Sequence, residues 1–272
     1  MVARGPRCFR VLMYIQSSFW TVYTSLTRPP YDGQVQEDRP LLLDLYCCQG
    51  GASTGYMRAG FDVIGADLAR QRHYPFPFLQ MDALEVLQRL LDGESLTFGD
   101  RTVREGDIAV KAASPPCQLY SITKHTHAKE YPDLVAPTRD LLRASDKPYV
   151  IENVPGAPLE DPLLLCGEQF HLTATDTDGT ELVLRRHRLF ESNVWLMAPG
   201  GHFHGGRQVG GVYGGGSDDR DWAKNVRRGG YTPSKPVREA LMGIDWMTLD
   251  GLSESIPPAY TEWIGHQVLA TL

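Results

Sequence analysis

The feature of the sequence that most constrains the fold is an apolar run that stops abruptly at two prolines. Residues 108–110 begin a short apolar segment, and residues 114–116, Ser-Pro-Pro, end it. Proline cannot donate to a sheet ladder and has a fixed φ, so a buried strand must stop there. Cys117 follows directly. Residues just beyond the carboxyl end of a strand lie where open α/β sheets bind ligands, so this thiol is a candidate nucleophile. Buried cysteines are usually inert, and the assignment therefore depends on neighbouring motifs.

An upstream segment has the layout of a nucleoside-binding site. Residues 41–47 form an apolar run typical of a buried parallel strand, and Gly50 and Gly51 open a helix. Residues 61–67 form a second such run, which ends in Asp67. Glycines let a backbone approach a ligand, and a carboxylate in this position binds ribose hydroxyls. The turn lacks the G-x-G-x-x-G order, so it does not predict a pyrophosphate site.

Two further strands are expected to end in acids. Residues 77–82 predict a short strand ending at Asp82, which can bind a ligand, cap the following helix, or do both. Residues 148–152 form an apolar run that ends in Glu152. A carboxyl group at the end of a buried strand is partly desolvated, which raises its pKa and lets it share a proton near neutral pH.

The rest of the chain gives weaker signals. We expect polar turns over residues 99–106 and 173–180 and a long loop over residues 119–137. Three helices are predicted, at residues 137–144, 235–243 and 255–268. Residues 182–190 are predicted to form one strand, on which Arg186 and Arg188 point to one face and Arg185 to the other. Cys166, in the apolar run 163–167, is expected to be structural.

Composition suits one large α/β domain with a small appendage. The chain has 272 residues, 42% of them hydrophobic and 22% charged. A net charge of −6 argues against a generally basic nucleic-acid coat but allows a local basic cleft. Five cysteines without regular spacing indicate a reducing compartment, no disulfide framework and no structural metal. No run of about 18 apolar residues predicts a membrane span.

Four ordered motifs resemble those of the cytosine-C5 DNA methyltransferases. They are Asp44-Leu-Tyr-Cys-Cys-Gln-Gly-Gly51, Ser114-Pro-Pro-Cys-Gln118, Glu152-Asn-Val154 and Arg186-His-Arg188. The resemblance spans residues 41–270. It implies an α/β fold with a mostly parallel, doubly wound Rossmann-like sheet. It also implies that the protein is an enzyme, a DNA (cytosine-5-)-methyltransferase. The implied organisation is a poorly ordered extension (1–38), a catalytic domain (39–190 and 236–272) and a small target-recognition region (191–235).

The resemblance also implies a cofactor, S-adenosyl-L-methionine. Tyr46 would pack against its adenine, Gly50 and Gly51 would flank its methionine part, Asp67 would hold the ribose and Asp82 the adenine amino group. The full expected cofactor-binding set is Tyr46, Cys48, Gly50, Gly51, Asp67, Leu68, Asp82, Ala83 and Pro115. The family usually has Gly at the position of Cys48 and Gly-Asn at the position of Ser253-Glu254, so the cofactor motifs depart from the pattern twice. A third departure is Leu184, which replaces the family's usual Gln before the arginine pair.

The implied reaction is covalent catalysis on a base flipped out of duplex DNA. Cys117 would attack C6 of cytosine so that C5 can accept the methyl group. Glu152 would stabilise the charge on the ring, and Arg186 and Arg188 would favour the thiolate and orient the base or phosphate. The expected substrate contacts are Gln118, Ser121, Asn153, Arg207, Arg227 and Arg228.

Residues 191–235 are rich in glycine, with basic and aromatic side chains between the glycines. This composition suits phosphate and base contacts, and the short length of the region suggests limited sequence recognition. We expect double-stranded DNA as partner, no metal, a monomer, and a place in the cytoplasm of a bacterial or phage-infected cell, as in restriction-modification. His125 and His127 lack a third metal ligand.

Other classes of protein stay open. A methyltransferase acting on RNA or free nucleotide fits the short recognition region and the acidic charge. A catalytically silent DNA-binding relative is disfavoured by the intact set of Cys117, Glu152, Arg186 and Arg188. An NAD-type oxidoreductase is disfavoured by the missing glycine fingerprint.

Overall fold

The computed structural model describes residues 39–120, 132–213 and 231–272. Predictions that concern the extension 1–38, the centre of the loop 119–137, Ser121, Arg227 and Arg228 lie outside these residues. So do His125 and His127. Within the described ranges, no helix is long and apolar enough to cross a membrane.

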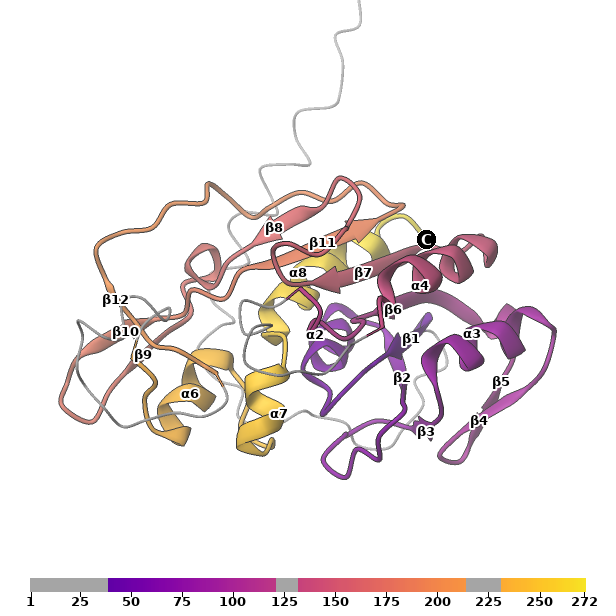
Figure 1. Ribbon diagram of the computed structural model, residues 1–272, viewed down its shortest axis with the longest axis horizontal. Coiled ribbons are helices and arrows are strands. Elements are labelled where there is room, and N and C mark those ends of the chain that lie inside the picture. The colour runs from indigo at the N-terminus through magenta and orange to yellow at the C-terminus, as the bar shows by residue number, and fades with distance from the viewer. Residues whose placement is uncertain (1–38, 121–131, 214–230) are drawn as a thin grey trace, which may run out of the picture.

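A seven-stranded sheet forms the centre of the fold (Figure 1). Its strands, in spatial order, are β3 (Phe78–Gln80), β2 (Asp62–Asp67), β1 (Leu41–Leu45), β6 (Ile108–Ala113), β7 (Tyr149–Asn153), β11 (Arg188–Ser192) and β8 (Leu163–Leu165). The first five are parallel, and β11 runs antiparallel to both of its neighbours. The predicted mostly parallel, doubly wound sheet is confirmed. Strand order reverses between β1 and β6, which is where such sheets bind ligands.

In the part of the chain that the structure describes, four helices cover the two faces of this sheet: α2 (Gly51–Ala59), α3 (Ala83–Leu91), α4 (Val135–Ala144) and α8 (Pro258–Leu269). The helices α6 (Lys235–Met242) and α7 (Leu249–Glu254) pack in a separate, smaller core. Successive residues of a strand point to opposite faces. Leu42 of β1 therefore packs in the core beneath α2 and α8, whereas Leu43 packs in the core beneath α3 and α4.

A separate three-stranded sheet lies at the left of Figure 1. Its strands are β12 (Gln208–Val209), β10 (Glu181–Val183) and β9 (Thr173–Thr175). Its core joins Leu182 and Val212 to Leu241 of α6 and Leu252 of α7. The small sheet and its helices therefore combine residues from before, within and after the predicted target-recognition region 191–235.

Some local predictions are wrong. The polar turn expected over residues 99–106 is in part the second strand of a hairpin, in which β4 (Leu96–Phe98) pairs with β5 (Arg101–Val103). A 3₁₀ turn follows at Glu105–Asp107. Three-residue strands show too little alternation to be recognised from sequence. For the same reason β9 lies where only a turn was expected. Helix α4 begins two residues before the predicted start, and the short helix α7 was not predicted.

The segment 182–190 is not one strand. It divides into β10 and β11, which belong to different sheets. Leu184 packs in the small core and Phe190 in the large one, so the chain must cross between them. Arg186 lies in that crossing and Arg188 at the start of β11. The predicted common strand face for these two arginines is therefore wrong.

Candidate active site

A thiol, a carboxyl group and a guanidinium group meet at the carboxyl edge of the main sheet. Cys117 follows β6, Glu152 is the penultimate residue of β7, and Arg188 begins β11. These strands bring them together because β6 pairs with β7 and β7 pairs with β11. Arg188 Nε lies 2.9 Å from Glu152 Oε1. This contact is an ion pair without hydrogen-bond alignment, and no described residue donates a hydrogen bond to that oxygen. Glu152 Oε1 can therefore accept one from a ligand.

Burial dominates the electrostatics of this cluster. It raises the pKa of the Cys117 thiol, which Arg188 and Arg186 partly counteract and Glu152 reinforces. Burial also raises the pKa of Glu152, against the lowering effect of Arg188 and Arg186. The direction expected for Glu152 from its place at a strand end is thus confirmed. A carboxyl group whose pKa is raised binds a proton more readily and can exchange it with a ligand.

Asn153 positions the proline turn. Its Nδ2 donates to the carbonyl oxygen of Pro115 at 3.0 Å, and its Oδ1 accepts from the amide of Val154 at 2.9 Å. The side chain is buried, and both ends of its amide are used by the protein's own backbone. These bonds give Asn153 a positioning role, and its contact with substrate stays a prediction. Its bond to Pro115 holds the segment that carries Cys117.

Arg186 joins three parts of the molecule. It is buried, its Nη1 donates to the carbonyl of Val212 at 2.8 Å, and its Nη2 donates to the carbonyl of Ser253. Burial and the nearby Arg188 lower its pKa to about 9. Its charge still acts on Cys117 and Glu152. Its nitrogens, however, hold the small core and the end of α7, so it acts on the cluster as a positioning residue.

The turn after β1 requires glycine at two positions. Gly50 has φ +86°, and a Cβ there would lie 2.8 Å from Pro75 Cδ. At Gly51, a Cβ would collide with Ser255 at the start of the last helical region. Tyr46 and Cys48 also have left-handed φ values, +57° and +47°. Such strain in non-glycine residues is concentrated at functional sites.

Two carboxylates flank this turn. Asp67, at the end of β2, accepts the amide of Cys48 on Oδ2 at 3.0 Å and the amide of Ala69 on Oδ1 at 2.8 Å. Asp82 caps α3 by accepting two backbone amides on Oδ1. The capping alternative for Asp82 is thus confirmed, and Oδ2 makes no capping bond. Leu68 is 69% exposed beside these acids.

The other expected cofactor residues are enclosed. Ala83, the first residue of α3, is buried, and so is Pro115. The Tyr46 hydroxyl lies 2.9 Å from Thr138 Oγ1, and burial raises the pKa of Tyr46 to about 12. These side chains line the edge of the site and offer few polar groups to a ligand.

The two residues of the cofactor motifs that depart from the family pattern, Cys48 and Glu254, contact each other. Cys48 Sγ donates to Glu254 Oε2 at 3.6 Å. Burial and the charge of Glu254 raise the pKa of Cys48, so the thiol keeps its proton. The cysteine that replaces glycine after β1 thus has its partner in Glu254, the last residue of α7.

Sequence reasoning missed Asp44. It lies in β1 with 1% exposure, and Ser53 Oγ donates to its Oδ2. No described residue donates to its Oδ1. Burial raises its pKa to about 7. The available signal was an acid inside the otherwise apolar run 41–45.

The expected substrate contacts are only partly described. Gln118 is exposed next to Cys117, and Arg207 is exposed just before β12. Both can reach a ligand outside the protein. Ser121, Arg227 and Arg228 lie outside the described residues.

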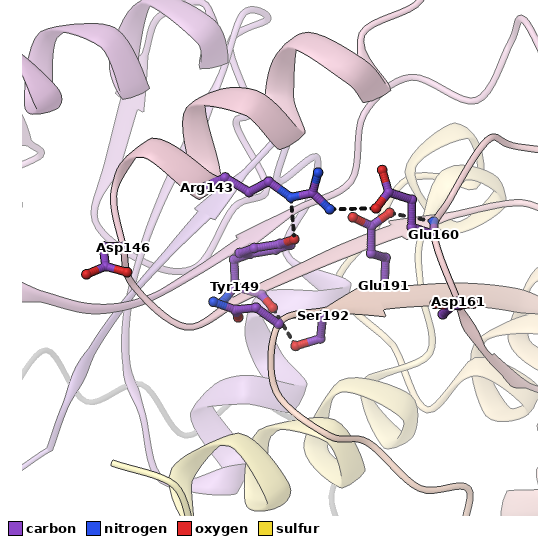
Figure 2. A pocket seen from close by; sticks show the side chains of 8 residues that line it. Arg143, Asp146, Tyr149, Glu160, Asp161, Glu191 and Ser192 are labelled. Carbon is purple, nitrogen blue, oxygen red and sulfur yellow. Dashed lines mark hydrogen bonds and ion pairs between the residues drawn. The ribbon is translucent and has the colours of Figure 1, made fainter.

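A cavity of about 340 Å³ lies at the opposite edge of the sheet (Figure 2). It is lined by Tyr149 at the start of β7 and Ser192 at the end of β11. Arg143 donates to Glu160 at 2.6 Å and to the Tyr149 hydroxyl at 3.3 Å across it. These groups satisfy one another, and the cavity is remote from Cys117, so it is not the candidate active site.

Sequence reasoning also missed a cluster of metal-ligand side chains. Cys166, His187, His202 and His204 bring their ligand atoms within 4.8 Å of one another. The prediction of no metal rested on spacing along the chain, and spacing could not show this group. Its one sequence signal is the interval of two between His202 and His204.

The comparisons with known proteins bear on the fold. No family model matches the chain, and no curated protein matches it. Among solved structures, a protein assigned as a DNA modification methyltransferase encoded within an E. coli prophage has TM-score 0.51 at 15% identity, covering 86% of this chain and 99% of that one.

Two methyltransferases from eukaryotes match less well. The Dnmt2 methyltransferase of S. pombe has TM-score 0.49 at 12% identity, covering 86% of this chain and 99% of that one. The methyltransferase EhMeth of Entamoeba histolytica has TM-score 0.49 at 11% identity, covering 86% and 98%. The prophage structure carries the conclusion: this chain has a Rossmann-like methyltransferase fold, as the resemblance implied.

Proposed function

We propose that this protein transfers a methyl group from S-adenosylmethionine to C5 of cytosine in DNA, through a covalent bond between Cys117 and C6. The observation that carries the proposal is the meeting of Cys117, Glu152 and Arg188 at neighbouring strand ends. A thiol nucleophile next to a protonated carboxyl is the pair of groups that this chemistry needs.

The groups beside the turn after β1 fit the methyl donor. Leu68 offers exposed apolar surface for an adenine ring. Asp67 and Asp82 offer carboxylate oxygens for ribose hydroxyls and for the adenine amino group. Gly50 and Gly51 let the backbone lie close to the methionine part. When bound, S-adenosylmethionine supplies a methyl group on a positively charged sulfur.

The steps assigned to this chain begin with the loss of the Cys117 proton. Arg188 and Arg186 favour the thiolate, which bonds to C6 of the cytosine. As that bond forms, the C5–C6 π electrons move into the ring, and protonated Glu152 donates its proton to N3. C5, now enamine-like, takes the methyl group. A base then removes the C5 proton, which restores the C5–C6 double bond and expels the Cys117 thiolate from C6, and N3 returns its proton to Glu152.

The substrate must present its cytosine outside the helical stack. Gln118, exposed beside Cys117, is positioned to meet the flipped base, and exposed Arg207 is available to a phosphate. Arg227 and Arg228 are proposed to add phosphate contacts. The proposed target-recognition region remains residues 191–235, and the proposed partner is double-stranded DNA.

The test is transfer of labelled methyl from S-adenosylmethionine to unmethylated duplex DNA. We expect label in DNA with the wild type and with Cys8→Ala, and none with Cys117→Ala. Duplex DNA containing 5-fluorocytosine adds a direct readout, since fluorine cannot leave C5 as a proton does and the adduct with Cys117 should persist. Label in RNA or nucleotide instead would overturn the substrate assignment alone. Donor binding without transfer to any substrate would overturn the enzyme assignment and favour a silent DNA-binding protein.

A further inference from the structure

We propose that Cys166, His187, His202 and His204 bind one zinc ion as a four-coordinate structural site. Their ligand atoms all lie within 4.8 Å of one another. The four residues come from separate places in the fold: Cys166 follows β8, His187 precedes β11, and His202 and His204 lie in the chain between β11 and β12.

Four of the six separations between the ligand atoms lie within about 0.5 Å of those expected around a tetrahedral zinc ion. The Nε2 atoms of His187 and His202 are 3.1 Å apart, those of His187 and His204 3.2 Å, and those of His202 and His204 2.8 Å. Cys166 Sγ is 3.7 Å from His204 Nε2. Zinc with Zn–N of about 2.05 Å and Zn–S of about 2.3 Å would separate nitrogens by about 3.3 Å and nitrogen from sulfur by about 3.6 Å.

Hydrogen bonding alone does not account for this arrangement. Each neutral imidazole Nε2 either carries one proton or accepts one. A triangle of three such atoms has three short contacts, and with one hydrogen per donor at most two of these can be hydrogen bonds. The third contact then sets two lone pairs or two N–H groups against each other. A cation at the centre accepts a lone pair from every nitrogen and removes this conflict.

The ligand set selects the metal. One thiolate and three imidazoles in tetrahedral arrangement suit zinc, whereas calcium and magnesium take oxygen ligands. Four protein ligands leave no coordination position for water, which is typical of a structural site rather than a catalytic one. His202 and His204 are exposed. The ion can therefore enter from solvent.

Neighbouring residues hold the ligands in place. Gln169 Oε1 accepts from the amide of Cys166 at 2.8 Å, and Gln169 Nε2 donates to the carbonyl of Gly200 at 3.0 Å. Arg185 donates to the carbonyl of Gly205 and pairs with Glu168. The segment 200–205 is thus tied at both ends around its two histidines. Ligands oriented by such outer contacts are characteristic of metal sites.

The site would attach this glycine-rich segment to the crossing that carries the arginines of the candidate active site. His187 stands between Arg186 and Arg188, and Arg188 Nη1 donates to the His187 carbonyl at 2.8 Å. The segment 199–207 has no helix or strand of its own. A bound ion would add a contact through the side chains of His202 and His204 to the two backbone contacts at the ends of the segment.

The test measures metal content rather than methyl transfer, so its outcome is separable from that of the proposed activity. Full-length protein without an affinity tag is purified without added metal, and zinc is measured per chain by mass spectrometry. Cys166→Ser and His202→Asn remove one ligand each. His171→Asn is the matched control, because His171 is exposed with φ +53°, which asparagine tolerates.

We expect about one zinc per chain in the wild type and in His171→Asn, and near-complete loss in both ligand variants. Cobalt(II) in place of zinc should give visible bands of tetrahedral cobalt, with a near-ultraviolet sulfur band lost in Cys166→Ser. His202 is exposed, so His202→Asn keeps the test valid if Cys166→Ser fails to fold. Wild type that binds neither zinc nor cobalt, or a His202→Asn variant that binds zinc as tightly as the wild type, would overturn the proposal.

Discussion

Burial sets the chemistry of two acids on the main sheet. Asp44 in β1 and Glu152 in β7 are both almost inaccessible, and burial raises the pKa of each. Arg188 lies against Glu152, whereas Asp44 has only Ser53 as a described hydrogen-bond donor through its side chain. The two acids therefore differ in role. Glu152 can exchange a proton with a ligand, whereas burial of the Asp44 carboxylate lowers the free energy of unfolding by an amount that depends on pH.

We predict that Asp44→Asn removes a pH dependence of stability. The pKa of Asp44 is about 7 in the folded protein against 3.8 as its reference. Between these values the folded state binds more protons than the unfolded state, so wild-type stability falls as pH rises. At 1.36 kcal/mol per pKa unit, the variant should gain roughly 4 kcal/mol relative to wild type between pH 4 and pH 8. Urea denaturation across this range measures it. Asp100→Asn, at an exposed acid, should run parallel to wild type.

We predict that Glu152→Gln lowers the rate of methyl transfer by about 10²- to 10⁴-fold, the usual contribution of a positioned proton donor. Glutamine keeps the shape and a hydrogen bond but does not donate a proton from a carboxyl group. DNA binding, measured by fluorescence anisotropy, should persist. Glu160→Gln changes an exposed acid paired with Arg143 and should leave the rate unchanged. A Glu152→Gln enzyme with full activity would show that the carboxyl group takes no part in the reaction.

At the scale of secondary-structure elements, the helices α2 and α8 depend on close approach. A Cβ at Gly55 of α2 would collide with Thr261 and with the carbonyl of Pro258, and would lie 2.7 Å from the amide nitrogen of Glu262. Gly265 of α8 likewise faces Ala59. Sequence predicted both helices from their glycine and proline boundaries. The need for glycine within them comes only from their packing.

We predict that Gly55→Ala destabilises the protein by about 1 to 3 kcal/mol, as overpacking does, although alanine favours helix by about 1 kcal/mol over glycine. Gly106→Ala is the control, because a Cβ at Gly106 meets nothing within 4 Å. The free energy of unfolding from denaturant titration compares the two. If Gly55→Ala proves as stable as Gly106→Ala, the helices do not require this close contact.

At the scale of the whole molecule, one arginine connects the two sheets and the last helices. Arg186 binds the carbonyls of Val212 and Ser253, and its own carbonyl accepts a hydrogen bond from the Tyr260 hydroxyl at 2.7 Å. These partners lie in the small core, in the last turn of α7 and in α8. The candidate active site therefore depends on how the small sheet is attached.

We predict that Arg186→Met destabilises the protein by roughly 2 to 5 kcal/mol, because two carbonyls lose their donor. Arg207→Met, at an exposed arginine, should change stability by less than about 0.5 kcal/mol. Thermal and denaturant unfolding measure both. Equal stability of the two variants would mean that Arg186 does not hold the sheets together.

Much of the fold follows from the sequence by itself. The main parallel strands, the helices α2, α3, α6 and α8, the stop at Pro115 and the acids at strand ends were all predicted, because local periodicity, proline and glycine act within a few residues. The order of the motifs likewise indicated the class of fold.

Tertiary structure alone decided the rest. The crossing at Arg186, the contact of Cys48 with Glu254 and the pairing of Arg188 with Glu152 join residues that are distant along the chain. The cluster of Cys166 and three histidines arises in the same way. Sequence spacing cannot show such groups, because the distance between two side chains is set by which strands pair and where the chain changes sheets.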